Sequence, residues 1–190
     1  MGNSLMSAAS ERDSLSTQWM ETFQALYHKA ITSYENGVRE AEGLCSPEDI
    51  DFLTSIGATP QEVFDCVEDW CDDGAPDPGT VFRLTEIRRD YFIHEQHGDQ
   101  PGPPLTMDTF PSREASMGGL VWFPRILAKA RAKLRGELPA NLMYSCGADR
   151  RFLRKVNMDA VEFLRLVRDA KTDDTHIVRV VVDRASLQKS

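Results

Sequence analysis

The stretch that decides the fold is residues 124–136, PRILAKARAKLRG. Proline is favoured in the first turn of a helix and glycine just after the last, so this stretch predicts a helix that begins at Pro124 and stops near Gly136. The positions that recur at helical spacing form an apolar stripe of Ile126, Leu127, Ala130 and Leu134. Cations border the stripe, with Arg125, Lys129 and Lys133 on one flank and Arg131 and Arg135 on the other. Such an amphipathic helix packs one face into a core.

Similar start and stop signals recur along the chain. Ser46-Pro47-Glu48-Asp49 and Thr59-Pro60-Gln61-Glu62 each place a capping hydroxyl before a first-turn proline, which predicts helices over 47–56 and 60–71. Apolar residues at helical spacing predict two longer helices, over about 16–36 and 78–97. Aspartates at 149 and 159 are predicted to cap two further short helices. Residues 176–182 are ambiguous, because their β-branched content favours a strand and the preceding Thr-Asp-Asp favours a helix; without a partner strand, helix is the preferred interpretation.

These elements predict an all-α, or mostly α, fold. We expect a bundle of about six to eight helices, arranged as one unit or as two small packed subdomains. The predicted division is a disordered start over residues 1–14, an acidic helical subdomain over 15–98, a proline-rich linker or strap over 99–117, and a basic helical domain over 118–184.

Charge is divided unevenly between the two halves of the chain. Residues 1–104 hold 6 Lys and Arg against 20 Asp and Glu, a net charge of −14, whereas residues 105–190 hold 16 against 10, a net +6. This asymmetry favours docking of one half on the other. No apolar run approaches the ~20 residues that a membrane span needs, and no signal-peptide pattern opens the chain, so we expect a cytoplasmic protein that does not contact membranes. The four cysteines show no Cys-x-x-Cys spacing and are expected to be free thiols.

The C-terminal half resembles a known family. The residues that carry the resemblance are Gly118-Gly119-Leu120-Val121-Trp122-Phe123-Pro124-Arg125 with the following Lys-Ala-Arg-Ala run, then Cys146-Gly147-Ala148-Asp149 and Phe152-Leu153. Over roughly residues 105–182 this pattern is similar to the family catalogued as domain of unknown function 5069. Upstream, segments such as Arg88-Arg89-Asp90-Tyr91-Phe92 resemble a helical part that accompanies the family in some bacterial proteins. Ala128 and Gly147 depart from the pattern, where an acidic residue and a proline are expected. The resemblance implies no activity.

Several patterns in the acidic half resemble functional motifs, but each has a simpler structural explanation. Helices 47–56 and 60–71 have helix-turn-helix spacing, but the exposed face of the second carries Glu62, Asp65, Glu68 and Asp69, which would repel duplex nucleic acid. Asp65, Asp69 and Asp72 could face a hard cation, although such a row is usually a solvated surface. His94 and His97 lack the spacing of a zinc-protease motif. We therefore predict no metal site and no cofactor.

Four residues remain as site candidates. Arg88 lies inside the apolar arc of its helix and should meet a carboxylate or a bound anion, the internal ion pair being the preferred reading. Arg125 and Lys129 follow a helix start, where anions are favoured. Cys146 precedes Arg150 and Arg151 at a helix start, an environment that depresses a thiol pKa and makes it a weak candidate nucleophile; a buried structural cysteine is the alternative.

Two functions are consistent with these features, and the sequence does not decide whether the protein is an enzyme. The preferred hypothesis is a non-catalytic binding or interaction module whose halves dock through opposite charge. The alternative is an enzyme or binding protein for a small anionic ligand, carrying phosphate or carboxylate, with Arg88, Arg125 and Lys129 as contacts and Cys146 as a reactive thiol. The expected partner is accordingly an unknown protein or a small anion.

Overall fold

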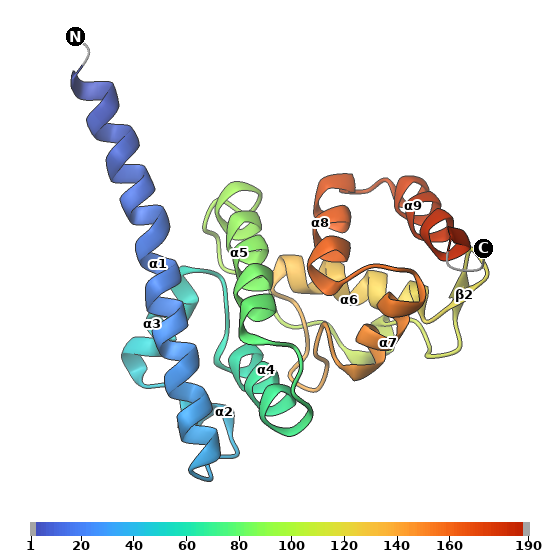
Figure 1. Cartoon of the computed structure of the whole chain (residues 1–190), viewed down its shortest axis with the longest axis horizontal. Helices are drawn as coiled ribbons and strands as arrows, with labels where there is room; N and C mark the ends of the chain where they lie inside the picture. The colour runs from blue at the N-terminus through green and yellow to red at the C-terminus, as the bar shows by residue number, and fades with distance from the viewer. Residues whose placement is uncertain (1–2, 188–190) are drawn as a thin grey trace.

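The computed structural model describes residues 3–187, with side chains from residue 18 onward. The described part is almost entirely helical, which confirms the predicted fold class (Figure 1). In chain order the elements are α1 (Asn3–Glu35), α2 (Ala41–Leu44), α3 (Pro47–Ser55), α4 (Pro60–Asp73), α5 (Pro78–His94), the 3-10 turn η1 (Met107–Thr109), β1 (Ser116–Met117), β2 (Leu120–Val121), α6 (Phe123–Arg135), α7 (Gly147–Lys155), α8 (Ala160–Ala170) and α9 (Asp174–Leu187). Within residues 3–187 there are nine α-helices, more than the predicted six to eight, and they include the one-turn α2.

The predicted helix starts are formed by the predicted local hydrogen bonds. Ser46, Thr59 and Asp159 each accept a bond from the backbone N–H three residues on, and the acidic side chain there bonds back to the cap. Gly136 closes α6 in the left-handed conformation. Residues 176–182 lie within α9, so the helical reading of this segment is confirmed.

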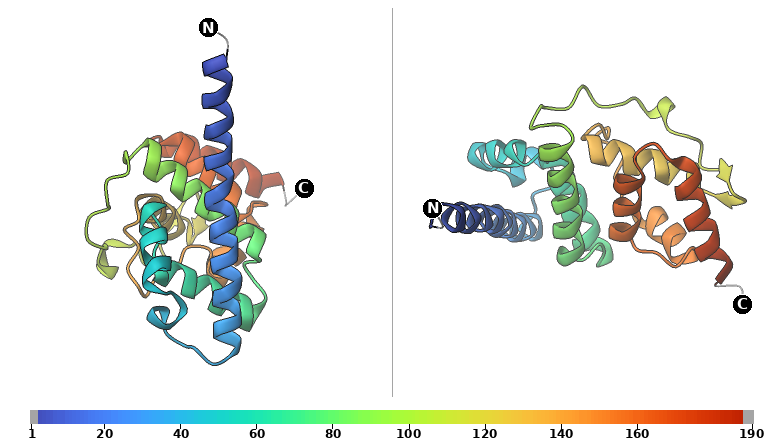
Figure 2. Two further views of the ribbon diagram at one scale, coloured as in Figure 1. Left: turned by 90° about the vertical axis from the view of Figure 1, so that its left-hand side faces the viewer. Right: turned by 90° about the horizontal axis from the view of Figure 1, so that it is seen from above.

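Helix α1 extends further toward the N-terminus than the helix predicted over about 16–36. Helix α1 begins at Asn3, inside the segment 1–14 that the sequence predicts to be disordered, and residues 1–2 lie outside the described part. No proline or glycine occurs between residues 3 and 35, so nothing in the sequence interrupts the helix. The N-terminal part of α1 projects beyond the rest of the fold (Figures 1 and 2).

Helix α5 joins two hydrophobic cores. Val81 belongs to the core built by α1, α3 and α4, whereas Leu84 and Ile87 belong to the core built by α6, α7, α8 and α9. Helix α5 accordingly packs against α1 on one side and against α6 and α8 on the other. Helix α5, which belongs to the acidic half of the sequence, therefore connects the acidic half to the basic half.

The proline-rich segment 99–117 forms an ordered strap. It runs from the end of α5 along the outside of the fold to the β1–β2 hairpin (Figure 2, right). The backbone N–H of Leu105 donates to the carbonyl of Glu137 at 2.9 Å, and the Phe110 side chain is buried. Gly118 and Gly119 form the two-residue turn of the hairpin, both with positive φ, as such tight turns require.

Candidate ligand-binding site

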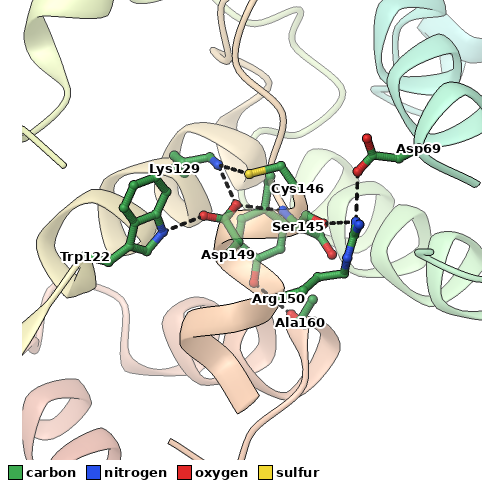
Figure 3. A network of polar contacts seen from close by, with 9 residues as sticks. Asp69, Trp122, Lys129, Ser145, Cys146, Asp149, Arg150 and Ala160 are labelled. Carbon is green, nitrogen blue, oxygen red and sulfur yellow. Dashed lines mark hydrogen bonds and ion pairs between the residues drawn. The ribbon is translucent and has the colours of Figure 1, made fainter. Parts of the chain in front are cut away.

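A buried carboxylate, Asp149, organises the centre of the C-terminal half (Figure 3). The indole N–H of Trp122 donates to its Oδ1 at 2.9 Å, and the backbone N–H of Ser145 donates to its Oδ2 at 2.9 Å. Lys129 Nζ, which is 1% exposed, forms an ion pair with the same Oδ2. Both oxygens of this fully buried carboxylate are thus hydrogen-bonded, as burial of a charge demands.

Asp149 was predicted to cap a helix, and this prediction is wrong. The residue at the N-cap of α7 is Cys146, and Asp149 lies inside the first turn. Its side chain accepts bonds from Trp122 and Lys129, 27 and 20 residues earlier in the chain, and from the backbone N–H of Ser145, just before the N-cap. The physical reason is that three donors, two of them side chains from distant parts of the chain, satisfy both oxygens of the buried carboxylate, which a single capping bond would not do.

Two residues that contact Asp149 have a backbone conformation that side chains disfavour. Trp122 has φ +78° and Ser145 has φ +73°, both in the left-handed region. Placing a non-glycine residue in this region raises the conformational free energy by about 1–2 kcal/mol, so other contacts must stabilise it there. The bonds to Asp149 do so, and they fix the chain immediately before α6 and immediately before Cys146.

Cys146 faces the cation that Asp149 holds. Lys129 Nζ donates to its Sγ at 3.3 Å, and the side chain is partly exposed (Figure 3). The same residue stands at the start of α7, where unpaired backbone N–H groups favour negative charge. The geometry therefore places the sulfur beside two sources of positive potential.

The site opens into a cleft of about 560 Å³ between the acidic and basic halves. One wall belongs to α4 and carries Asp65, Glu68 and Asp69. The opposite wall carries Trp122, Lys129 and Cys146, together with Arg113, Arg125 and Arg151. A volume of this size is in the range of small-molecule sites.

Ion pairs join the two halves at the cleft and at other places along their contact. Arg150 Nη1 contacts Asp69 Oδ2 at 2.8 Å, and Lys133 Nζ contacts Glu62 Oε1 at 2.9 Å. Further pairs across the halves link α8 and the loop after it to α5, through Arg165 with Glu86, Arg168 with Asp90 and Lys171 with Glu95. The cleft is thus a gap left where oppositely charged surfaces meet.

Arg125 is a buried arginine of the cleft wall, whereas Arg113 and Arg151 on the same wall are exposed. Its side chain is only 7% exposed, and its Nη1 donates to the carbonyl of Pro111 at 2.6 Å, with the guanidinium 5.9 Å from the Trp122 ring. Among residues 18–187 no carboxylate forms an ion pair with it. A carbonyl and an aromatic face stabilise a cation less than a carboxylate does, so the remaining donors of Arg125 are available to a ligand.

The structure brings three of the four predicted site residues together. Arg125, Lys129 and Cys146 line the same cleft. Arg88 does not, and the carboxylate predicted for it is absent: it is fully buried under Gly136, its Nη1 donates to Gln96 Oε1 at 2.7 Å, and its Nε and Nη2 have no partner in the described part. Burial lowers the pKa of this guanidinium. Arg88 thus lies outside the cleft, between α5 and the end of α6, where Gln96 also donates to the carbonyl of Arg135.

Sequence reasoning missed Asp149 as the centre of the site and Arg113 and Arg151 as members of the cleft. Arg151 was noted as a cation near Cys146 but not as part of a binding site, and nothing in the sequence distinguishes Arg113 from other exposed cations. For metals, the described side chains contain no group of three or more His, Cys, Asp or Glu residues that could hold an ion.

Comparison with known proteins agrees with the resemblance seen in the sequence. Residues 108–189 match the family Domain of unknown function (DUF5069). No curated protein and no solved structure matches the chain. The DUF5069 part contains the whole basic wall of the cleft, including Arg113, Arg125 and Cys146, whereas the acidic wall on α4 lies outside it. Within residues 3–187 no helix is long and apolar enough to cross a membrane.

Asp65 on the acidic wall gives the fold a testable pH dependence. Burial, helped by Glu62 and Glu68 nearby, raises its pKa to about 6 although Gln61 donates a bond to it at 2.7 Å. An unfolded aspartate titrates near pH 4, so between about pH 4 and pH 6 the folded state holds a proton that the unfolded state has lost. The stability contributed by this group is consequently lost as pH rises through that window.

Asp65→Asn removes this titration. We expect the variant and the parent to have equal free energies of unfolding near pH 4, and the variant to be more stable by about 1–2 kcal/mol at pH 7. Urea unfolding at a series of pH values measures the difference. A difference that stays constant from pH 4 to pH 7 would show that Asp65 is not buried against the other acids.

Proposed function

We propose that the protein is a binding protein for a small molecule with an anionic group, which it holds in the cleft between its two halves. The anionic group would lie against Arg125, with Arg113 and Arg151 at the rim of the same wall. We assign no catalytic activity to this cleft.

Arg125 is the observation that carries this proposal. A cation that is 93% buried normally has an anionic partner, because the cost of removing it from water is several kcal/mol. Its neighbour Lys129 has such a partner in Asp149, and Lys133 has one in Glu62. Within the described residues Arg125 has the carbonyl of Pro111 and the face of the Trp122 ring but no carboxylate, so a carboxylate or phosphate from outside the chain would complete its surroundings.

The opposite wall narrows the class of ligand. Glu68 and Asp65 on α4 face the cleft and would repel a long polyanion such as duplex nucleic acid. A small molecule with one anionic end avoids this repulsion, and a hydrogen-bond donor at its other end would meet the carboxylates. The ion pairs that flank the cleft hold the walls at a fixed separation, which favours a site that exists before the ligand binds.

Anion binding by Arg125 can be measured without knowing the natural ligand. We expect inorganic phosphate and acetate, as the minimal probes of the two anion classes, to raise the melting temperature of the parent protein in a saturable way against matched chloride. Arg125→Gln is expected to weaken binding of the effective probe by about 10- to 100-fold, the worth of one charge-assisted hydrogen-bond pair.

Arg131→Gln is the matched control, because Arg131 lies on the same helix and pairs with Asp174 away from the cleft. Its affinity for the probe should equal that of the parent. If neither probe binds in the millimolar range, or if both variants lose binding equally, the assignment of the cleft as an anion site is wrong.

A further inference from the structure

Cys146 differs from the other three cysteines in its charged surroundings. Its Sγ accepts a hydrogen bond from Lys129 Nζ at 3.3 Å, and it lines the cleft. Lys129 cannot swing away into solvent, because it is 1% exposed and held by Asp149 on its other side. The cation beside this sulfur is therefore a fixed part of the fold.

The remaining thiols lie in surroundings that disfavour negative charge on sulfur. Burial raises the pKa of Cys66 to about 12 and that of Cys45 above its usual range. Cys71 is partly exposed, as Cys146 is, but burial together with Glu35 and Asp72 raises its pKa. Cys71 thus provides an internal comparison, since it is partly exposed but burial and two neighbouring carboxylates oppose negative charge on its sulfur.

We propose that Cys146 is an oxidation site, at which a hydroperoxide entering the cleft converts the thiolate to a sulfenic acid. The requirements for such a site are a fixed cation beside the sulfur and access from solvent, and the Lys129 contact and the cleft supply them. This proposal does not depend on the binding of an anionic ligand, because it rests on the sulfur and its fixed cation.

The step balances with groups that are present. A lone pair of the thiolate attacks one oxygen of the hydroperoxide, an S–O bond forms and the O–O bond breaks. Sulfur loses two electrons and the hydroperoxide gains them. The departing hydroxide or alkoxide takes a proton from Lys129 Nζ and leaves as water or an alcohol, after which Lys129 recovers a proton from water in the cleft. Lys129 thus stabilises the thiolate first and supplies the proton afterwards.

The test uses hydrogen peroxide on the full-length folded protein, with dimedone to trap sulfenic acid and peptide mass spectrometry to locate it. We expect Cys146 to be labelled at least about tenfold faster than Cys71, and this preference to disappear in concentrated urea, where the neighbouring charges are dispersed. Equal labelling of the two thiols in the folded protein, or a preference that persists in urea, would overturn the proposal.

Two variants test the role of the cation. Lys129→Met should abolish the preference for Cys146 in a protein whose circular dichroism still shows the folded state, and Cys146→Ser should remove the label while leaving Cys71 unchanged. Lys129→Met also removes the ion-pair partner of Asp149, so Lys129→Arg, which keeps a cation there, is measured as a control. We expect the rate of Cys146 labelling in Lys129→Arg to be closer to that of the parent than to that of Lys129→Met. Labelling of Cys146 that is unchanged in folded Lys129→Met would show that the cation has no part in the reaction. The anion titration is a separate measurement, so either proposal can fail without the other.

Discussion

Replacing Asp149 by alanine is expected to lower the free energy of unfolding by about 3–5 kcal/mol, the cost of leaving a buried partner charge uncompensated. The carboxylate is fully buried and receives bonds from Trp122, Lys129 and the backbone of Ser145. Its loss would leave the Lys129 ammonium, 1% exposed, without an anion. It would also release two residues whose left-handed backbone is held by these bonds. Urea unfolding followed by circular dichroism measures the change.

Asp174→Ala is the matched control for this experiment. Asp174 also lies in the first turn of a helix and pairs with an arginine, Arg131, but the side chains of the pair are 50% and 28% exposed. Exposed ion pairs contribute about 0–1 kcal/mol, so this variant should unfold almost as the parent does. A loss at Asp149 no larger than the loss at Asp174 would mean that the site is open to water and that Lys129 is solvated.

The outcome at Asp149 bears on the proposed function as well as on stability. The three bonds to its carboxylate place the start of α6, which carries Arg125, against the start of α7, which carries Cys146. If the carboxylate were only one surface charge among many, the basic wall of the cleft would have no fixed geometry. A large loss would therefore support a cleft that is formed before any ligand enters.

Local signals made most of the helices predictable from the sequence. The capping boxes at Ser46, Thr59 and Asp159 are satisfied within three residues, so the residues that define them are adjacent in the sequence. The stop at Gly136 likewise depends on the conformation of one residue. The β1–β2 hairpin was missed because each of its strands has only two residues, too few to show alternation, although the Gly118-Gly119 pair that turns it was visible.

The site was predictable as a set of residue types but not as an arrangement. The row of Arg125, Lys129 and Lys133 was apparent from spacing alone. In the structure these three residues have different partners. Lys133 forms an ion pair with α4 and Lys129 forms one with α7. Arg125 lines the cleft and has no acidic partner in the described part. These partners are 20 and 71 residues away, and sequence periodicity carries no information at such separations. Gln96, which Arg88 contacts in place of the expected carboxylate, is only eight residues away, but it lies beyond the end of α5, where helical spacing no longer predicts which side chains meet.

Gly57→Ala is expected to be the most destabilising of the glycine substitutions between α3 and α5, with a loss of about 2–5 kcal/mol from backbone strain and overpacking together. Gly57 has φ +72°, in the left-handed region. A methyl group here would stand 2.6 Å from Cγ and 2.8 Å from Cβ of Phe92 on α5. These atoms are the base of a ring that is 3% exposed and has the Arg88 guanidinium 5.3 Å from its centre, so the ring has no free space to enter.

Gly74→Ala separates the two causes. Gly74 closes α4 with φ +70°, nearly the same backbone conformation, but a methyl group there would have no atom within 4 Å. Its substitution should lower the free energy of unfolding by about 1–2 kcal/mol, through backbone strain alone. The additional loss of unfolding free energy in Gly57→Ala then measures the steric contact with Phe92. Equal losses at the two positions would mean that α5 does not approach the α3–α4 turn as closely as the structure places it. The contact therefore fixes the α3–α4 turn, after which the helix that carries the acidic wall begins, against the helix that joins the two cores.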